Sequence, residues 1–208
     1  MRSLMSLEDT TIGILASNEF EDIELEYPLL QLSHEGADIV LIPVQAGHHP
    51  RPSLESVGTK PVTGRYGTPL PPDVIKEGNR YVVKDLSEIE PDDLDAVFIP
   101  GGFSPDHLRT HEGAVQFVRE VADQGKIVSA ICHGPWMFVE TELADGIEIT
   151  AYEAVHNDLE NAGATVVDVP STRDGNIVTG RQPDDLPEFC EELAAALAER
   201  AAEQQPAD

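Results

Sequence analysis

The sequence predicts an α/β protein with a doubly wound, mostly parallel sheet and helices on both faces. Three observations favour this class. Short runs rich in β-branched residues alternate with segments of helical spacing along most of the chain. Several strand-like runs, such as "LDAVFIPGG" and "KIVSAIC", are apolar throughout, which is typical of strands buried on both faces. Helix-length segments separate them, so successive strands can run parallel.

The first elements follow this alternation. "TIGILAS" (11–17) is expected to be a strand, and "EDIELEYPLLQLSHEG" (21–36) a helix, because its apolar residues recur with helical spacing until Gly36. "ADIVLIPV" (37–44) is the next strand. Residues 45–80 form a Pro- and Gly-rich insert without a sustained period, for which we expect short strands or a hairpin.

The alternation resumes after the insert. We expect strands at 94–102 and 126–132, with a helical segment at 104–125 between them and a helix from about Gly134. The remaining expected elements are strands at 147–152, 165–170 and 177–180, a helix at 153–161, a turn at 173–176 and a closing helix. A chain of 208 residues suits one domain spanning 1–208.

The charge of the chain is extreme. Asp and Glu number 39 against 13 Lys and Arg, for a formal net charge of -26. Such a surface does not suit a phosphate backbone, so we expect no nucleic-acid partner. The acidic residues are spread along the chain, which indicates adaptation to a salty cytoplasm, as in halophilic archaea, where salt screens like charges. An ordinary acidic protein is the alternative.

Membrane and targeting signals are missing from the sequence. No apolar run approaches the roughly 20 residues that span a bilayer, and the N-terminus resembles no targeting peptide. We therefore expect a cytoplasmic protein without a membrane partner.

Three polar or glycine-rich stretches follow expected strands. They are "ASNEFED", "PGGFSPDH" and "ICHGPW". Ligands of open α/β sheets bind at the carboxyl ends of the strands, near a switch point, so we expect these stretches to form one site.

Cys132 is the candidate nucleophile. It stands between a strand and an expected helix start, where unpaired N–H groups lower the pKa of a thiol. Gly134 and Pro135 suit the sharp turn and the first helical turn. The alternative is an inert buried cysteine, which we expect for Cys190 on its amphipathic helix. His133 is the candidate base, although neighbouring side chains on a turn tend to diverge.

Three further groups could complete the site. Asp106, which follows Ser104 as expected N-cap, is the best placed acid to orient His133. The N–H groups of Gly101 and Gly102 could form an oxyanion hole with the amide of His133, or the glycines could simply serve a tight turn. Glu21 could place a protonated carboxyl group beside the thiol. By spacing alone, Glu19 and Asp22 are equal candidates.

The blocks "NEFEDIELEYPLLQLSHEGADIVL", "LDAVFIPGGFSPDHLR", "GKIVSAICHGPW" and "NIVTGRQPDDLPEF" resemble those of the ThiJ/PfpI superfamily, closest to its PfpI-type intracellular cysteine proteases. They occur in family order and cover nearly the whole chain. The resemblance implies a flavodoxin-like fold similar to class I glutamine amidotransferases.

The resemblance also implies roles for residues. Cys132 is the nucleophile, His133 its partner, and Glu21 the carboxyl group touching the thiol. An acidic residue from a neighbouring subunit orients the histidine, and Asp106 stands there in place of the usual glutamate, one methylene shorter. Tyr152 matches a tyrosine near the site, with a core aromatic as the alternative. A homo-oligomer with the site near an interface follows, and no cofactor is implied.

Two substrate classes suit such a site. Attack on a peptide carbonyl would give hydrolysis, and attack on a reactive aldehyde would give glyoxalase or deglycase chemistry in stress protection. The rivals are a redox-sensing or chaperone-like stress protein that uses Cys132 without turnover, and an amidotransferase-like domain. The sequence also contains His48, His49, His107 and His111, which we expect to be surface histidines rather than metal ligands.

Overall fold

A computed structural model describes residues 6–46, 61–72, 77–78 and 80–204. A seven-stranded sheet in the order β10-β11-β7-β6-β1-β2-β5 forms its centre. All neighbouring strands run parallel except β10, which pairs antiparallel with β11. The strands are β1 Thr11–Ala16, β2 Asp38–Pro43, β5 Val82–Val83, β6 Ala96–Ile99, β7 Ile127–Ile131, β10 Ser171–Asp174 and β11 Ile177–Gly180. The predicted doubly wound, mostly parallel sheet is therefore confirmed.

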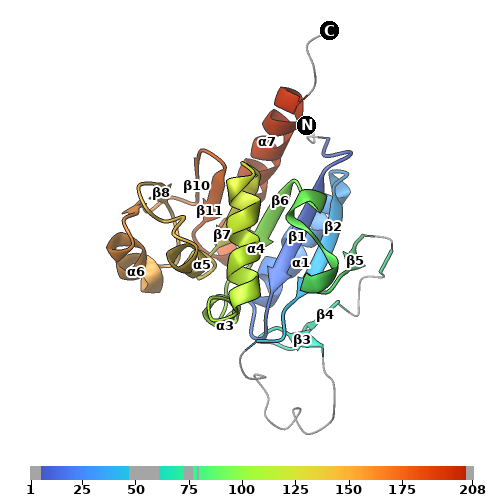
Figure 1. Cartoon of the computed structure of the whole chain (residues 1–208), viewed down its shortest axis with the longest axis horizontal. Coiled ribbons are helices and arrows are strands. Elements are labelled where there is room, and N and C mark those ends of the chain that lie inside the picture. Colours follow the sequence, from blue (N-terminus) through green and yellow to red (C-terminus); the bar gives the residue numbers. More distant parts are fainter. Residues whose placement is uncertain (1–5, 47–60, 73–76, 79, 205–208) are drawn as a thin grey trace, which may run out of the picture.

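Helices cover both faces of this sheet (Figure 1). On one face, α1 (Asp22–His34) and α7 (Leu186–Gln204) pack against each other and against the apolar side chains of β1 and β2. On the other face lies α4 (Glu112–Asp123), whose buried stripe includes Phe117 and Val121. The sheet thus separates two apolar cores, as its two-sided strands require.

Shorter elements surround this centre. The helices are α3 Ser104–Leu108, α5 Trp136–Glu140 and α6 His156–Asn161, and the 3-10 turns are η1 Leu86–Glu88, η2 Pro91–Asp93, η3 Glu153–Val155 and η4 Pro183–Asp185. Two small sheets pair β3 (Val62–Thr63) with β4 (Pro69–Leu70), and β8 (Glu148–Ile149) with β9 (Thr165–Val166).

Several expectations differ from the structure. The strands expected at 147–152 and 165–170 are the two-residue strands β8 and β9, and the helix expected at 153–161 begins with the 3-10 turn η3. The helical segment at 104–125 is two helices, because the ring of His111 accepts the N–H of Ala114 and starts α4. The helix expected from Gly134 begins at Trp136, after a turn. The strand β10 was not expected, because "STRD" is polar and only half-buried at the sheet edge.

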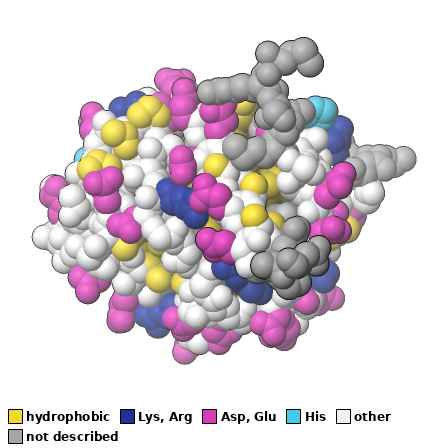
Figure 2. Space-filling model, turned by 90° about the horizontal axis from the view of Figure 1, so that it is seen from above, with side chains coloured by type: hydrophobic (Ala, Val, Ile, Leu, Met, Phe, Trp, Pro, Cys, Tyr) yellow, Lys and Arg dark blue, Asp and Glu magenta, His cyan; other side chains and the backbone are white. Residues whose placement is uncertain are grey.

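The surface is acidic on the face drawn in Figure 2, where acidic side chains are scattered rather than gathered in one patch. No helix among residues that the structure describes is long and apolar enough to cross a membrane.

The topology fixes where a ligand would bind. From β1 the chain passes to β2 on one side, and later returns to β6 on the other side. The order reverses between β1 and β6, so a crevice forms at the carboxyl ends of these strands and of neighbouring β7.

Candidate active site

The three stretches expected to meet do lie together. A bridge joins Phe20, after β1, to Gly102, after β6. The Phe103 N–H donates to the carbonyl of Glu19 at 2.9 Å, and the Glu21 N–H to that of Gly101 at 3.2 Å. Cys132 directly follows β7, the neighbour of β6. Parallel pairing thus brings distant segments to one edge of the sheet.

Cys132 occupies a strained turn. Its φ of 61° lies in the left-handed region that residues other than glycine rarely adopt. Its N–H donates to the carbonyl of Gly180 at 3.0 Å, and its carbonyl accepts from Tyr152 at 2.9 Å, so neighbouring segments hold this conformation. A Cβ at Gly134 would lie 2.6 Å from the carbonyl oxygen of Ile99, so only glycine fits there. The side chain points into the site and is 7% exposed.

His133 meets the thiol despite being its neighbour in sequence. The distance from Cys132 Sγ to His133 Nδ1 is 3.3 Å. The imidazole stacks on Tyr152 with 5.0 Å between ring centroids and meets the edge of Trp136 at 5.4 Å. Burial, and secondarily the charge of Arg65, lowers the pKa of His133. The neutral ring can therefore accept the thiol proton near neutral pH.

The carboxyl group at the thiol belongs to Glu24, and the expectation of Glu21 was wrong. Glu24 is fully buried, and its Oε2 accepts the N–H of Gly101 at 2.7 Å. Glu21 is the N-cap residue of α1 and its Oε2 pairs with Arg65 Nη1 at 2.8 Å. Glu21 thus precedes the first helical turn, whereas Glu24 lies within it on the buried face.

The other acidic candidates have different roles. Asp22 accepts the N–H groups of Tyr66 and Thr68 at 2.9 and 2.8 Å, and so fixes the β3–β4 hairpin to α1. Glu19 lies 3.9 Å from His107 Nε2. The periodicity of α1 is the signal that could have identified Glu24. It lies four and eight residues before Pro28 and Leu32, which are also buried, and so shares their face of the helix.

Glu24 and Cys132 form a coupled pair. Burial, as the largest cause, raises the pKa of Glu24 to about 8. Burial also raises the pKa of the Cys132 thiol, and the negative charge of an ionised Glu24 raises it further. The Oε1 atom of Glu24 is buried without a partner of ordinary hydrogen-bond geometry among the described residues, although the carboxyl group acts as a hydrogen-bonding neighbour of the thiol. Burial and mutual repulsion therefore disfavour two negative charges in the pair, and a thiolate forms most readily beside a protonated Glu24.

This pair also changes what we expected of the thiol. The sequence predicted a pKa lowered by a helix N-terminus, but α5 begins four residues after Cys132 and has only five residues. Two backbone amides, those of His133 and Gly102, do favour the thiolate, yet burial outweighs them. A thiolate at this position would therefore require neighbouring groups that take the proton, because the thiol itself is not acidic.

The two glycines after β6 have different roles, although the sequence suggested an oxyanion hole for both. The Gly101 N–H is occupied by Glu24, whereas the amides of Gly102 and His133 face the sulfur and could stabilise a developing oxyanion. Gly101 supplies space instead. A Cβ there would lie 2.7 Å from Glu24 Oε2 and 2.8 Å from the Cβ of Cys132.

Asp106 is exposed on α3. Within the described part of this chain its carboxylate makes no hydrogen bond or ion pair, and its intersubunit role stays a prediction. The expected N-cap is also displaced: Phe103 precedes the helix, and the Ser104 hydroxyl accepts the N–H of Ser17 at 2.7 Å. That bond ties the turn after β6 to the end of β1.

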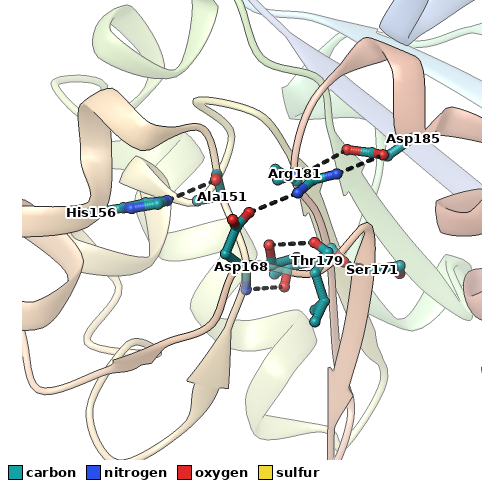
Figure 3. Close-up of polar contacts among 9 residues, drawn as sticks. Ala151, His156, Asp168, Ser171, Thr179, Arg181 and Asp185 are labelled. Atoms are coloured by element: carbon teal, nitrogen blue, oxygen red, sulfur yellow. Dashed lines mark hydrogen bonds and ion pairs between the residues drawn. The ribbon is translucent and has the colours of Figure 1, made fainter.

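Tyr152 stacks on His133 and also lines a cavity beside it. A cavity of about 550 Å³ is lined by Ala151, Tyr152, Glu153, His156, Asp168, Arg181 and Gln182. Beside it, His156 Nε2 donates to the carbonyl of Ala151 at 2.9 Å, while Arg181 bridges Asp168 at 2.7 Å and Asp185 at 2.9 Å (Figure 3). The His156 bond holds the segment that contains Tyr152, and the Arg181 pairs join the segments of Asp168 and Asp185 beside it.

A metal site finds no support in the described residues, which contain no cluster of three or more His, Cys, Asp or Glu side chains able to hold an ion. His111 serves as the cap of α4. His48 and His49 lie outside the described residues.

A model of the DJ-1/PfpI family matches residues 10–196. The chain belongs to the DJ-1/PfpI family. Two relatives extend this result. An uncharacterized protein of Archaeoglobus fulgidus is 36% identical over 184 residues, covering 88% of this chain and 96% of its own. The Bacillus subtilis protein named "Putative cysteine protease YraA" is 37% identical over 178 residues, covering 86% and 92%.

Solved structures of the family share this fold. A two-domain protein from Anabaena variabilis, with DJ-1/ThiJ/PfpI-like and ferritin-like domains, matches with a TM-score of 0.74 and 30% identity, over 90% of this chain and 50% of that one. DJ-1beta of Drosophila melanogaster matches with a TM-score of 0.75 and 22% identity, over 96% and 95%. The first agrees in sequence as well as fold, and the second in fold alone.

Proposed function

We propose that this DJ-1/PfpI protein is a thiol enzyme in which Cys132 attacks the carbonyl carbon of a small reactive aldehyde, in the manner of a glyoxalase or deglycase. The observation that carries the proposal is the constellation around the sulfur: His133 Nδ1 at 3.3 Å and a buried Glu24 whose pKa is raised to about 8. A group that titrates near neutral pH can both give and take a proton.

The steps follow from these positions. His133 takes the thiol proton, and the sulfur bonds to the aldehyde carbon while the carbonyl oxygen receives the proton, giving a hemithioacetal. Once the sulfur is bonded and carries no charge, the ionised form of Glu24 removes the proton from that carbon and returns it to the adjacent carbonyl carbon of a 2-oxoaldehyde. The hydroxyl proton of the hemithioacetal passes to the oxygen of that adjacent carbon, so the C–S carbon becomes the carbonyl of a 2-hydroxy thioester. Water cleaves the thioester to a 2-hydroxy acid and restores the thiol, so no oxidant or reductant is consumed.

Peptide hydrolysis is the second candidate, favoured by the name of the Bacillus subtilis relative. The same nucleophile and base would form an acyl-enzyme. A thiol that is only 7% exposed favours the smaller substrate.

The test compares both substrate classes on the full chain in high salt. Methylglyoxal consumption and cleavage of fluorogenic peptides are measured for the unaltered protein, Cys132→Ala and the control Cys190→Ala. We expect Cys132→Ala to lose at least about 100-fold in kcat/KM on methylglyoxal. Cys190, buried in the α7 core with a raised pKa, should be dispensable. Equal rates for the unaltered protein and Cys132→Ala on both substrates would refute the proposal that this protein is a thiol enzyme.

We further propose a cytoplasmic homo-oligomer in a salt-rich cell, in which Asp106 of a neighbouring copy orients His133. The net charge of -26 supports the salt requirement, because screening relieves repulsion among like charges. The thermal midpoint should therefore rise steadily with KCl, and sedimentation should detect the oligomer at high salt. A monomer there would remove the shared-subunit role of Asp106.

A further inference from the structure

Arg65 lies in the turn between β3 and β4, close enough to the thiol site for its charge to affect Glu24 and His133. Its N–H donates to the carbonyl of Phe20 at 3.0 Å, which docks the turn onto the segment after β1. Its guanidinium lies 5.4 Å from the ring centroid of Phe103, and that ring lies 6.4 Å from the ring of His133. Phe103 is thus a neighbour of both the cation and the proposed base.

The guanidinium is held but not saturated. Its Nη1 donates to Glu21, while among the described residues no acceptor is within hydrogen-bond distance of Nε or Nη2. The rings of Phe103 and Tyr66 lie 5.4 and 5.8 Å from it and fix its plane by cation–π contact. The side chain is 40% exposed. A planar cation held in this way has donors left for an incoming anion.

The other charges around the thiol site make this cation significant. Glu24 is neutral below its raised pKa of about 8, Glu19 lies near His107, and Asp106 is exposed on α3. The charge of Arg65 affects the pKa of both Glu24 and His133, so its field extends into the thiol site. In a chain with a net charge of -26, a cation here offsets a general repulsion of anions.

We infer that Arg65 selects substrates that carry a carboxylate or other anionic group close to the carbonyl carbon attacked by Cys132. The inference rests on the proposed carbonyl chemistry for the identity of the reacting group, but the anion selectivity belongs to the geometry of Arg65. Glu21 holds Arg65 in place and, by neutralising part of its charge, limits the strength of the selection.

Two alkylating reagents test this selectivity at the sulfur itself. Iodoacetate and iodoacetamide react alike: the sulfur bonds to the methylene carbon and iodide leaves, but only iodoacetate is anionic. The ratio of their second-order rate constants at Cys132, assigned by peptide mass spectrometry, cancels any change in the thiolate fraction. The ratio therefore reports how the electrostatic field at the site favours an anionic reagent over a neutral one.

We expect Arg65→Gln to lower the iodoacetate-to-iodoacetamide ratio by about threefold to fivefold, since the site is half-exposed. Arg65→Lys should retain part of the ratio, because it keeps the charge without the fork, and Glu21→Gln should raise it. The matched control is Arg173→Gln, which removes a cation paired with Glu199 at the sheet edge and should leave the ratio unchanged.

A ratio in Arg65→Gln within about 1.5-fold of the unaltered protein would overturn the inference, as would an equal loss in Arg173→Gln, which would indicate net charge alone. Protection of Cys132 from iodoacetamide by glyoxylate, compared with neutral glycolaldehyde, extends the test to carbonyl compounds. Protection by glyoxylate should weaken in Arg65→Gln, and equal weakening for both aldehydes would contradict selection. A protein without turnover that shows the ratio change would refute the proposed function and leave the selectivity standing.

Discussion

Replacing Glu24 with glutamine should separate two protonation events that the buried Glu24–Cys132 pair couples. Glutamine keeps the shape of the side chain and an oxygen to accept the Gly101 N–H, which Glu24 binds at 2.7 Å. Its amide can donate to a thiolate as a protonated carboxyl group does, but it never ionises. The variant thus reproduces the protonated state of Glu24 at every pH.

The size of the effect follows from the pKa of about 8 for Glu24. Below that pH both proteins present a neutral group to the sulfur and contain the same fraction of thiolate. Above that pH, Glu24 ionises in the unaltered protein and its charge opposes ionisation of the thiol. The thiolate fraction of the unaltered protein therefore levels off, while that of Glu24→Gln continues to rise. The variant should therefore react about twofold faster at pH 8 and about tenfold faster at pH 9, since one pKa unit is a factor of ten.

The assay is the rate of iodoacetamide alkylation at Cys132 between about pH 6 and pH 9.5. Peptide mass spectrometry separates this product from alkylation of Cys190, which is buried at 2% exposure. Profiles that stay parallel through pH 9, or a variant at least tenfold slower near pH 7, would refute the reasoning. The first result would mean that Glu24 does not titrate beside the thiol, and the second that glutamine cannot replace the protonated acid.

Three further predictions concern the same neighbourhood. Since the pKa of Glu24 is raised from 4.5 to about 8, the folded protein loses stability as pH rises between these values. In denaturant unfolding, the free energy of unfolding of Glu24→Gln should exceed that of the unaltered protein by about 3–5 kcal/mol at pH 8 and by little at pH 4.5. A difference that does not change with pH would contradict this. Trp136 is the only tryptophan and touches His133, so its fluorescence should fall as the imidazole becomes charged, with a midpoint below 6.5 that disappears in His133→Asn. Gly101→Ala should destabilise the fold by about 1–3 kcal/mol and slow alkylation of Cys132. In the control Gly113→Ala on helix α4, the added Cβ would come no closer than 3.3 Å to another atom, so the stability should change by less than about 1 kcal/mol.

Much of the fold was predictable because local pattern decided it. The buried strands β1, β2, β6 and β7 were visible as apolar runs, and α1 and α7 as periodic stripes. Elements that depend on contacts with other parts of the fold were not predictable from local pattern. The edge strand β10 has no apolar alternation, and the break before α4 depends on the ring of His111 binding a backbone amide.

The candidate site divides in the same way. Cys132 and His133 could be found because adjacent residues at a strand end share a local environment, and the 3.3 Å contact agrees with that pairing. The carboxyl partner could not be fixed by counting from the strand, because the start of α1 decides which of several acidic residues faces inward. Glu24 takes that place and Glu21 faces Arg65.

By itself the sequence determined the sheet class, the acidic surface and the turn that carries the candidate nucleophile, since each depends on residues close together in the chain or on composition alone. The tertiary structure decided which groups surround the sulfur, namely Glu24 from α1 and the amide of Gly102 after β6, and it placed Tyr152 against the ring of His133. It also decided the proton affinity of the thiol, because burial is a property of the assembled core, and in this site burial outweighs the local amides that favour a thiolate.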